Sequence, residues 1–309
     1  MTAERALRDR SGSPVSGVLL LDKPAGLTSN QALQQAKRLL LARKAGHTGS
    51  LDPIATGLLP LCFGEATKLS RFMLDADKRY AAVIRLGIAT TTFDADGEVV
   101  EQRPVDVGRS LLQRTLGEFQ GEIEQIPPMY SAIKRGGRPL YELARQGMDV
   151  EREPRRVLIR EIVLRAFEGD RVMLEIVCSK GTYVRSLAHD LGRRLGCGAH
   201  LAQLRRLAVG TLTLEHAVTL DALAALPDAA SRVAHLVSME AVVDTLPDVR
   251  LTLLATHYLL RGQPVSVRHR HAPGWVRLYD ARDHFLGMGE VLDDGRVAPR
   301  RLLAITAKP

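Results

Sequence analysis

The most constraining stretch of this chain is residues 46–60, GHTGSLDPIATGLLP, which surround a single acidic residue, Asp52, with three Gly, two Pro, two Thr, a Ser and a His. Asp followed by Pro is a common start of a helix, because the carboxylate caps backbone N–H groups and Pro fits the first helical position. Glycines, however, let a backbone approach a ligand closely. The two roles are compatible, since a cap fixes the direction of a carboxylate. The run therefore predicts a segment that presents Asp52 as a reactive group.

Three shorter motifs extend this pattern along the chain. Lys23 begins the motif KPAG, Tyr80 ends KRY, and Arg185 ends KGTYVR. Together with the run around Asp52, these motifs resemble the TruB family of tRNA pseudouridine synthases, and the resemblance covers nearly the whole chain. It implies an isomerase of the bacterial, stand-alone type that converts uridine to pseudouridine at position 55, in the T loop of tRNA.

The reaction that the resemblance implies breaks the bond from C1′ to N1 of uridine, turns the uracil and rejoins it through C5. It consumes neither water nor electrons, so we expect no cofactor and no metal. Motifs for nucleotide cofactors are also missing, because Gly196-x-Gly198 lacks a third Gly and no Gly-Lys-Ser/Thr loop occurs. One carboxylate can serve, since charge builds up at C1′ as the bond breaks, as it does in glycoside hydrolysis.

By the same resemblance, the catalytic residues are Asp52, Tyr80 and Arg185. The residues that bind the RNA substrate are His47, Lys68 and Tyr183. Taken singly, each has an ordinary explanation, such as a surface arginine or a core tyrosine. The target uridine has to leave its base stack, and an enclosed pocket raises the pKa of a carboxylate, which a neighbouring arginine reverses. We therefore expect Arg185 to keep Asp52 ionised.

The charge of the chain points to a nucleic-acid partner. The formal net charge is +8, and only eight of the 43 basic residues are Lys. Arginine binds phosphate through two N–H groups at once, so the excess suits RNA; a GC-rich genome explains the same excess equally well. Aromatic residues make up only 4% of the chain, which argues against a broad base-stacking surface.

Hydrophobic patterns and turn residues predict a mixture of strands and helices. The predicted strands are residues 17–21, 58–63, 80–86, 156–166 and 172–177. The predicted helices are a first one that begins at Thr28 or Ser29, runs to Lys44 and is stopped by Gly46, then residues 65–74, 107–116 and 183–195. Residues 90–97 read as a polar turn. The order shows no repeating βαβ unit, so we expect an α+β fold with a mixed sheet.

Composition divides the chain into four parts. Residues 1–16 read as a disordered tail, and residues 17–248 as the pseudouridine synthase catalytic domain. Residues 126–152 are rich in Pro, Gly and charge and are longer than a simple connection, so we expect an RNA-binding flap there. After residue 248 the pattern changes to short strands, at 263–267, 276–279, 284–291 and 296–302. Residues 249–309 resemble the small PUA-type β-barrel that closes bacterial TruB proteins.

Two alternatives remain open at this stage. The chain could be a non-catalytic RNA-binding or RNA-folding protein, although the intact Asp52, Tyr80, Tyr183 and Arg185 argue against that. It could also be a guide-RNA-dependent relative, although the long basic flap and the lack of extensions for partner proteins favour the stand-alone type. We expect a monomer whose partner is the T stem-loop of tRNA. Three scattered cysteines and no long apolar run predict a cytoplasmic protein without a membrane segment.

Overall fold

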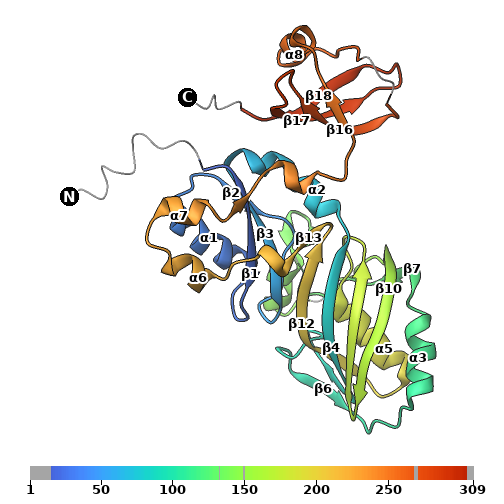
Figure 1. Ribbon diagram of the computed structural model, residues 1–309. Coiled ribbons are helices and arrows are strands. Elements are labelled where there is room, and N and C mark those ends of the chain that lie inside the picture. Colours follow the sequence, from blue (N-terminus) through green and yellow to red (C-terminus); the bar gives the residue numbers. More distant parts are fainter. Residues whose placement is uncertain (1–14, 132, 149, 268–270, 305–309) are drawn as a thin grey trace.

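A mixed sheet of ten strands dominates the computed structural model, which describes residues 15–131, 133–148, 150–267 and 271–304 (Figure 1). Eight strands follow the order β14-β1-β3-β12-β4-β11-β10-β7, while β2 pairs with β3 and β13 with β12. Their bounds are β1 Gly17–Lys23, β2 Ala45–His47, β3 Thr56–Phe63, β4 Lys78–Leu86, β7 Gly121–Gln125, β10 Arg155–Glu168, β11 Arg171–Cys178, β12 Ala199–Val209, β13 Leu212–Thr213 and β14 Leu236–Val237. Among the described strand pairs of this sheet, only that of β12 with β3 is parallel and the others are antiparallel, so the expected mixed sheet is confirmed.

The main hydrophobic core lies between this sheet and four helices, α1 (Ser29–Leu39), α3 (Arg109–Gly117), α5 (Val184–Leu195) and α6 (Leu220–Ala225). Strand β3 is buried along almost its whole length because its apolar run continues without alternation. Strand β11 instead alternates, and buries every second side chain from Val172 to Cys178. The long pair β10 and β11, predicted from the sequence, is antiparallel as a hairpin requires.

Helix α1 begins where the sequence predicts but ends earlier. Thr28 caps it, and the side chain of Gln31 completes a capping box. The helix stops at Leu39, not at Lys44, because Leu41 adopts a left-handed conformation with φ of 52°. The N–H groups of Leu41 and Ala42 then reach back to the carbonyls of Arg38 (3.1 Å) and Lys37 (3.0 Å), which is a Schellman turn without glycine. Gly46 lies in β2 and does not stop the helix.

Several shorter elements lie in the described part of the chain before the C-terminal module. The predicted helix at 65–74 is split into a 3₁₀ helix, Gly64–Leu69, and α2, Ser70–Asp75. The predicted polar turn connects β5 (Ile88–Thr90) to β6 (Val99–Gln102). The remaining elements are α7 (Ala229–Val233) and 3₁₀ helices at Leu214–His216 and Glu240–Val242. None of the helices in the described ranges is long and apolar enough to cross a membrane. The predicted tail, apart from Val15 and Ser16, lies outside the described residues.

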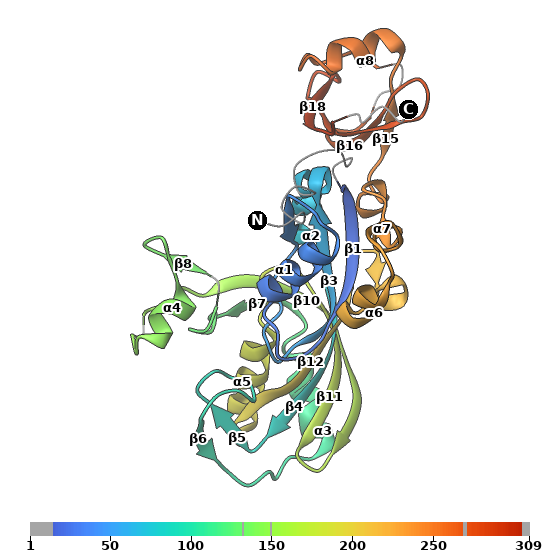
Figure 2. The ribbon, with the colours of Figure 1, turned by 90° about the vertical axis from the view of Figure 1, so that its left-hand side faces the viewer.

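The described residues between 126 and 152 form a projection that contains three short elements. Strands β8 (Lys134–Arg135) and β9 (Arg138–Pro139) pair as a small hairpin, and α4 (Leu140–Arg145) follows. Figure 2 shows β8 and α4 standing out to one side of the large sheet. The base of the projection is fixed, because the hydroxyl of Ser186 in α5 donates to the carbonyl of Ile126 at 3.0 Å.

The C-terminal module, residues 248–304, has its own four-stranded sheet and its own hydrophobic core (Figure 1). The sheet order is β15 (Asp248–Arg250), β16 (Gly274–Tyr279), β17 (Phe285–Val291) and β18 (Val297–Leu302), with helix α8 (Leu253–Leu259) after β15. The expected PUA-like barrel is not confirmed, because the described strands form an open sheet. The predicted strand at 263–267 is reduced to one bridge, between Val265 and Val297, and the sequence patterns missed α8.

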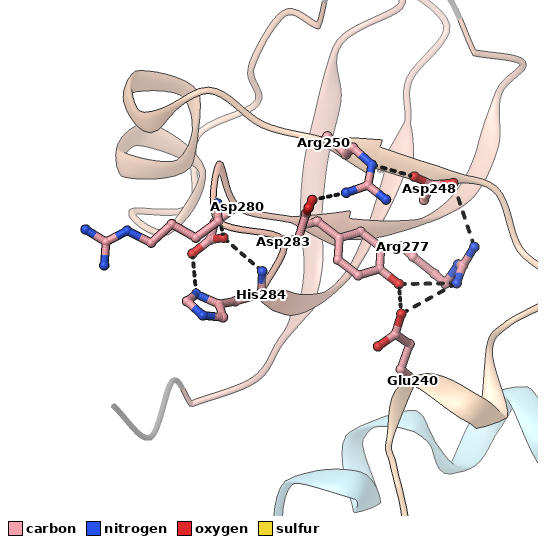
Figure 3. Close-up of polar contacts among 9 residues, drawn as sticks. Glu240, Asp248, Arg250, Arg277, Asp280, Asp283 and His284 are labelled. Atoms are coloured by element: carbon pink, nitrogen blue, oxygen red, sulfur yellow. Dashed lines mark hydrogen bonds and ion pairs between the residues drawn. The ribbon is translucent and has the colours of Figure 1, made fainter. Parts of the chain in front are cut away.

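Polar and aromatic contacts attach the C-terminal module to the rest of the chain. Figure 3 shows Arg277 between the carboxylates of Asp248 and Glu240, each 3.8 Å away. The Nε of Arg277 also donates to the carbonyl of Leu246 at 2.8 Å. Nearby, the rings of Phe72 in α2 and Trp275 in β16 meet edge to face, with centroids 5.2 Å apart.

Candidate active site

The loop that carries Asp52, residues 48–55 between β2 and β3 (the Asp52 loop), is tied down on both sides of the carboxylate. The Ser29 hydroxyl accepts from the N–H of Leu51 (2.7 Å) and donates to its carbonyl (3.0 Å). The N–H of Gly26 donates to the carbonyl of Pro53 at 2.8 Å. An isolated Asp-Pro would suggest a helix cap, but Asp52 does not cap a helix. Its carbonyl closes a turn with the N–H of Ala55 (3.0 Å) that leads into β3.

Arg185 reaches the carboxylate of Asp52 from the first turn of α5. Its Nε lies 2.9 Å from Oδ2 of Asp52, and its side chain is 5% exposed while that of Asp52 is 38% exposed. Its Nη2 donates to the carbonyl of Tyr130 at 2.7 Å, which links the site to the projection. The pairing of Asp52 with Arg185, which the motifs predict, is therefore present, although 133 residues separate the two in the sequence.

A second buried carboxylate, Asp94, shares the same guanidinium and was missed in the sequence. Its Oδ2 lies 3.3 Å from Nη1 of Arg185. Asp94 is held by the hydroxyl of Thr92 and by the N–H of Asp96 (3.2 Å). Phe93 beside it has a φ of 66° and stacks on the ring of His189 at a centroid distance of 3.9 Å. In the sequence, Asp94 is only an acidic residue in a turn after a strand, and such a turn does not indicate that its acid contacts Arg185.

The charges around Asp52 act on its pKa in opposite directions. Burial raises the pKa of the Asp52 carboxyl above its ordinary value, and the guanidinium of Arg185 lowers it. Asp94 raises it again, whereas the ammonium of Lys23 lowers it. The net effect raises the pKa of Asp52, so the two cations offset the effect of burial only in part.

Lys23 lies fully buried at the end of β1, close enough to Asp52 for the two charges to interact. Its Nζ donates to the carbonyls of Pro24 (2.7 Å) and Leu27 (2.8 Å). Burial is the main cause that lowers the pKa of Lys23 to about 8. These contacts fix the turn that holds Pro53 through Gly26, so Lys23 supports the Asp52 loop.

The two predicted tyrosines come from different elements, and both interact with the charge of Asp52. Tyr80 lies in β4, opposite Arg206 of β12, and Tyr183 precedes the first turn of α5. The backbone N–H of Tyr183 donates to Oε1 of the buried Gln125 (3.0 Å), and Nε2 of Gln125 donates to the carbonyl of Tyr183 (3.3 Å). Burial raises the pKa of both phenols, and the charge of Asp52 acts on each. The structure therefore gathers Asp52, Tyr80, Tyr183 and Arg185 in one place.

The other two predicted RNA-binding residues lie in different surroundings. His47 is in β2 at the start of the Asp52 loop, and its buried Nδ1 has no hydrogen-bond partner among the described residues. Burial lowers the pKa of His47, as does the charge of Arg206. Lys68 instead lies at the junction with the C-terminal module, where its Nζ contacts Glu65 (2.6 Å) and the carbonyl of Leu302 (2.9 Å). Its role in RNA binding stays a prediction.

Nothing in the described part of the chain gathers three or more His, Cys, Asp or Glu side chains in a way that could hold a metal ion. The site itself offers one partly exposed carboxylate, a buried guanidinium, a second acid and two phenols. A carboxylate so placed can act on a sugar carbon that develops positive charge.

Comparison with solved structures identifies the fold. A chain in the crystal structure of a Cbf5-Nop10-Gar1 complex superposes with a TM-score of 0.71 at 26% identity, covering 93% of this chain and 84% of that one. A chain in the structure of an H/ACA RNP bound to a substrate RNA containing 2′-deoxyuridine superposes with a TM-score of 0.70 at 23% identity, covering 97% and 93%. These superpositions show that the chain shares the fold of both proteins over nearly its whole length.

Family models and curated relatives are more specific. The model of the TruB family pseudouridylate synthase N-terminal domain matches residues 37–184, and two TruB C-terminal models match residues 185–244 and 247–303. A tRNA pseudouridine synthase B of Stutzerimonas stutzeri is 53% identical, covering 94% of this chain and 96% of the relative. One of Vibrio parahaemolyticus is 50% identical, covering 96% and 98%. The chain belongs to the TruB family of pseudouridine synthases.

Proposed function

We propose that this chain isomerises uridine to pseudouridine at position 55 in the T loop of tRNA, and that Asp52 acts at the glycosidic bond. The observation that carries the proposal is the 2.9 Å contact of Asp52 with the buried Arg185. The tRNA substrate is supported by relatives named tRNA pseudouridine synthase B that are 50% or more identical over nearly the full chain.

Asp52 serves both halves of the reaction in this proposal. As the C1′–N1 bond breaks, positive charge develops at C1′, and the ionised carboxylate stabilises it by attack on C1′ or by taking a proton from C2′. The detached uracil turns and bonds to C1′ through C5, after which C5 loses its proton and N1 gains one, so that no proton is consumed overall; Tyr80 stacks on the base and Tyr183 lines the site. Arg185 keeps Asp52 ionised against the effect of burial. No water or redox partner enters the balance.

RNA binding is assigned to the parts that surround this centre. The projection at residues 126–152 carries exposed Arg135, Arg138 and Arg145, which suits a flap that contacts phosphates. We place the catalytic domain at residues 17–248 and a PUA-type RNA-binding domain at 249–309. The enzyme acts as a monomer in the cytoplasm in this proposal, and its three free, buried cysteines suit a reducing compartment.

The two alternatives predict different behaviour. A guide-RNA-dependent enzyme would need other components, as the Cbf5 chain of similar fold has in its complex. The high identity to tRNA pseudouridine synthase B over nearly the whole chain favours action without them. A non-catalytic RNA-folding protein would not need the charge balance around Asp52, and would keep its effect on RNA when Asp52 is neutralised.

The deciding experiment is single-turnover isomerisation of unmodified tRNA by the purified protein alone, with RNA binding measured in parallel. Asp52→Asn should lower the rate by several powers of ten, as removal of a nucleophile does in other enzymes, and leave RNA affinity similar. Asp96→Asn, which neutralises an exposed acid nearby, is the matched control. A tRNA with cytidine at position 55 should give no product. More than a few per cent of the wild-type rate in Asp52→Asn would refute the assignment.

A further inference from the structure

Arg206 is a fully buried cation for which the reaction proposed above has no role. Its side chain, in β12, is 1% exposed. It makes no ion pair with a carboxylate among the described residues, whereas its neighbour Arg205 pairs with Asp22 at 2.7 and 3.0 Å. Burying a charge without an acid is costly unless hydrogen bonds compensate. The contacts that compensate here therefore indicate what the residue does.

Those contacts lie on both sides of Asp52. The Nε of Arg206 donates to the carbonyl of Leu58 at 2.7 Å, and its Nη2 donates to the carbonyl of Gly49 at 3.2 Å. Gly49 precedes Asp52 by three residues, and Leu58 follows it by six. One planar guanidinium thus bridges the start of the Asp52 loop and the strand that continues from it. Arginine suits this task because its donors form a rigid fork.

The backbone of Arg206 touches the same region. Arg206 pairs with Gly57 in the parallel register of β12 with β3, and with Tyr80 in the antiparallel register of β12 with β4. A Cβ at Gly57 would lie 2.3 Å from the carbonyl oxygen of Arg206, so only glycine allows this approach. The guanidinium also interacts with the phenol of Tyr80. Arg206 therefore contacts both the Asp52 loop and Tyr80.

We infer that Arg206 is a positioning residue, which fixes the carboxylate of Asp52 and the ring of Tyr80 relative to each other across the target uridine. The inference rests on the proposed function and adds a residue to its machinery. Asp52 has to face C1′ while Tyr80 faces the base, and a displacement of about 1 Å between reacting groups can cost about 100-fold in rate. Arg206 lies between β3, which follows the Asp52 loop, and β4, which carries Tyr80, and needs no contact with the RNA.

The test compares Arg206→Lys with Arg205→Lys, the adjacent arginine of the same strand. Lysine keeps the charge, but its single ammonium cannot reproduce the guanidinium fork on Leu58 and Gly49. At saturating tRNA, Arg206→Lys should slow single-turnover isomerisation by about 100-fold, whereas Arg205→Lys should stay near the wild-type rate. Tyr80→Phe is then added to each. In the double variant with Arg206→Lys, the fold loss in rate should be smaller than the product of the two single losses, since both changes disturb one contact. In the double variant with Arg205→Lys, the fold losses should multiply.

Several outcomes would overturn the inference. An Arg206→Lys rate equal to that of Arg205→Lys would do so, as would losses that multiply with Tyr80→Phe. A lower melting temperature or weaker tRNA binding with an unchanged saturated rate would make Arg206 merely structural. Should Arg206→Lys fail to fold by circular dichroism, Arg206→Gln, which keeps an N–H donor, replaces it under the same criteria. An inactive wild type would refute the proposed function and this inference together, whereas an active wild type with unaffected variants refutes only the inference.

Discussion

The Nη1 of Arg185 lies 3.3 Å from Oδ2 of Asp94, so the cation that pairs with Asp52 also pairs with a second acid. The negative charge of Asp94 offsets part of the stabilisation that the guanidinium gives to ionised Asp52. Both Arg185 and Asp94 thus act on the pKa of Asp52, beside burial and Lys23, and changing either residue should move that pKa in a predictable direction.

Removing the cation and removing the second acid should shift the pH dependence of the reaction in opposite directions. Arg185 lowers the pKa of Asp52 and Asp94 raises it. Because the proposed reaction requires ionised Asp52, the acidic limb of the rate should move to higher pH in Arg185→Met and to lower pH in Asp94→Asn. Single-turnover rates measured across pH at saturating tRNA give both limbs. Shifts in the same direction, or an unmoved limb in Arg185→Met, would contradict the charge balance.

The close approach of β12 to the Asp52 loop makes Gly57 hard to replace. Gly57 has a φ of +97°, and an added Cβ would meet the backbone of Arg206 at 2.3 Å. Gly57→Ala should reduce the free energy of unfolding by on the order of 4 kcal/mol. Gly26→Ala is the matched control, because Gly26 has a φ of +82° with no atom near its Cβ, and should cost only about 1–2 kcal/mol. Equal losses in chemical denaturation would show that backbone strain alone matters at Gly57.

Exposed arginines of the C-terminal module should contribute to RNA affinity through phosphate contacts. Arg261, Arg282 and Arg301 are exposed and make no ion pair with any described residue. Replacing all three with Gln should weaken tRNA binding and reduce the slope of log affinity against log salt by about 0.7–0.9 for each lost contact. The rate at saturating tRNA should not change. Arg300→Gln, which breaks the 2.7 Å pair with Glu290, is the control, and an unaltered slope in the triple variant would exclude this surface.

Lys78 should make stability depend on alkaline pH. Its Nζ donates to the carbonyls of Met73, Leu74 and Ala76, and burial lowers the pKa of Lys78 from 10.5 to about 8. Between those values the unfolded chain holds the proton and the folded chain does not, so the free energy of unfolding rises with pH, by on the order of 3 kcal/mol over the window. Subtracting the curve of Lys78→Met isolates this effect. A flat difference between pH 8 and 10.5 would contradict it.

Local patterns predicted the elements of the fold well. Thr28 and Gln31 form the expected cap of α1, and β10 with β11 forms the expected hairpin. These features depend on residues a few positions apart, whose interactions the sequence itself displays. The end of α1 was misplaced because Leu41 adopts a left-handed conformation that is normally left to glycine, and no propensity signals such a choice.

The residues of the site also fall into two groups, those that the sequence predicts and those that only the structure reveals. The sequence by itself predicted Asp52, Arg185, Tyr80 and Tyr183 as site residues, because their motifs resemble those of a known family residue by residue. Only the tertiary structure brought in Asp94 and Arg206. Asp94 meets Arg185 across 91 residues, and Arg206 meets Leu58 across 148. An acid in a turn or an arginine in a strand has no local pattern that indicates its partner, since that partner is set by strand order and by which side chains the packed sheet excludes from water.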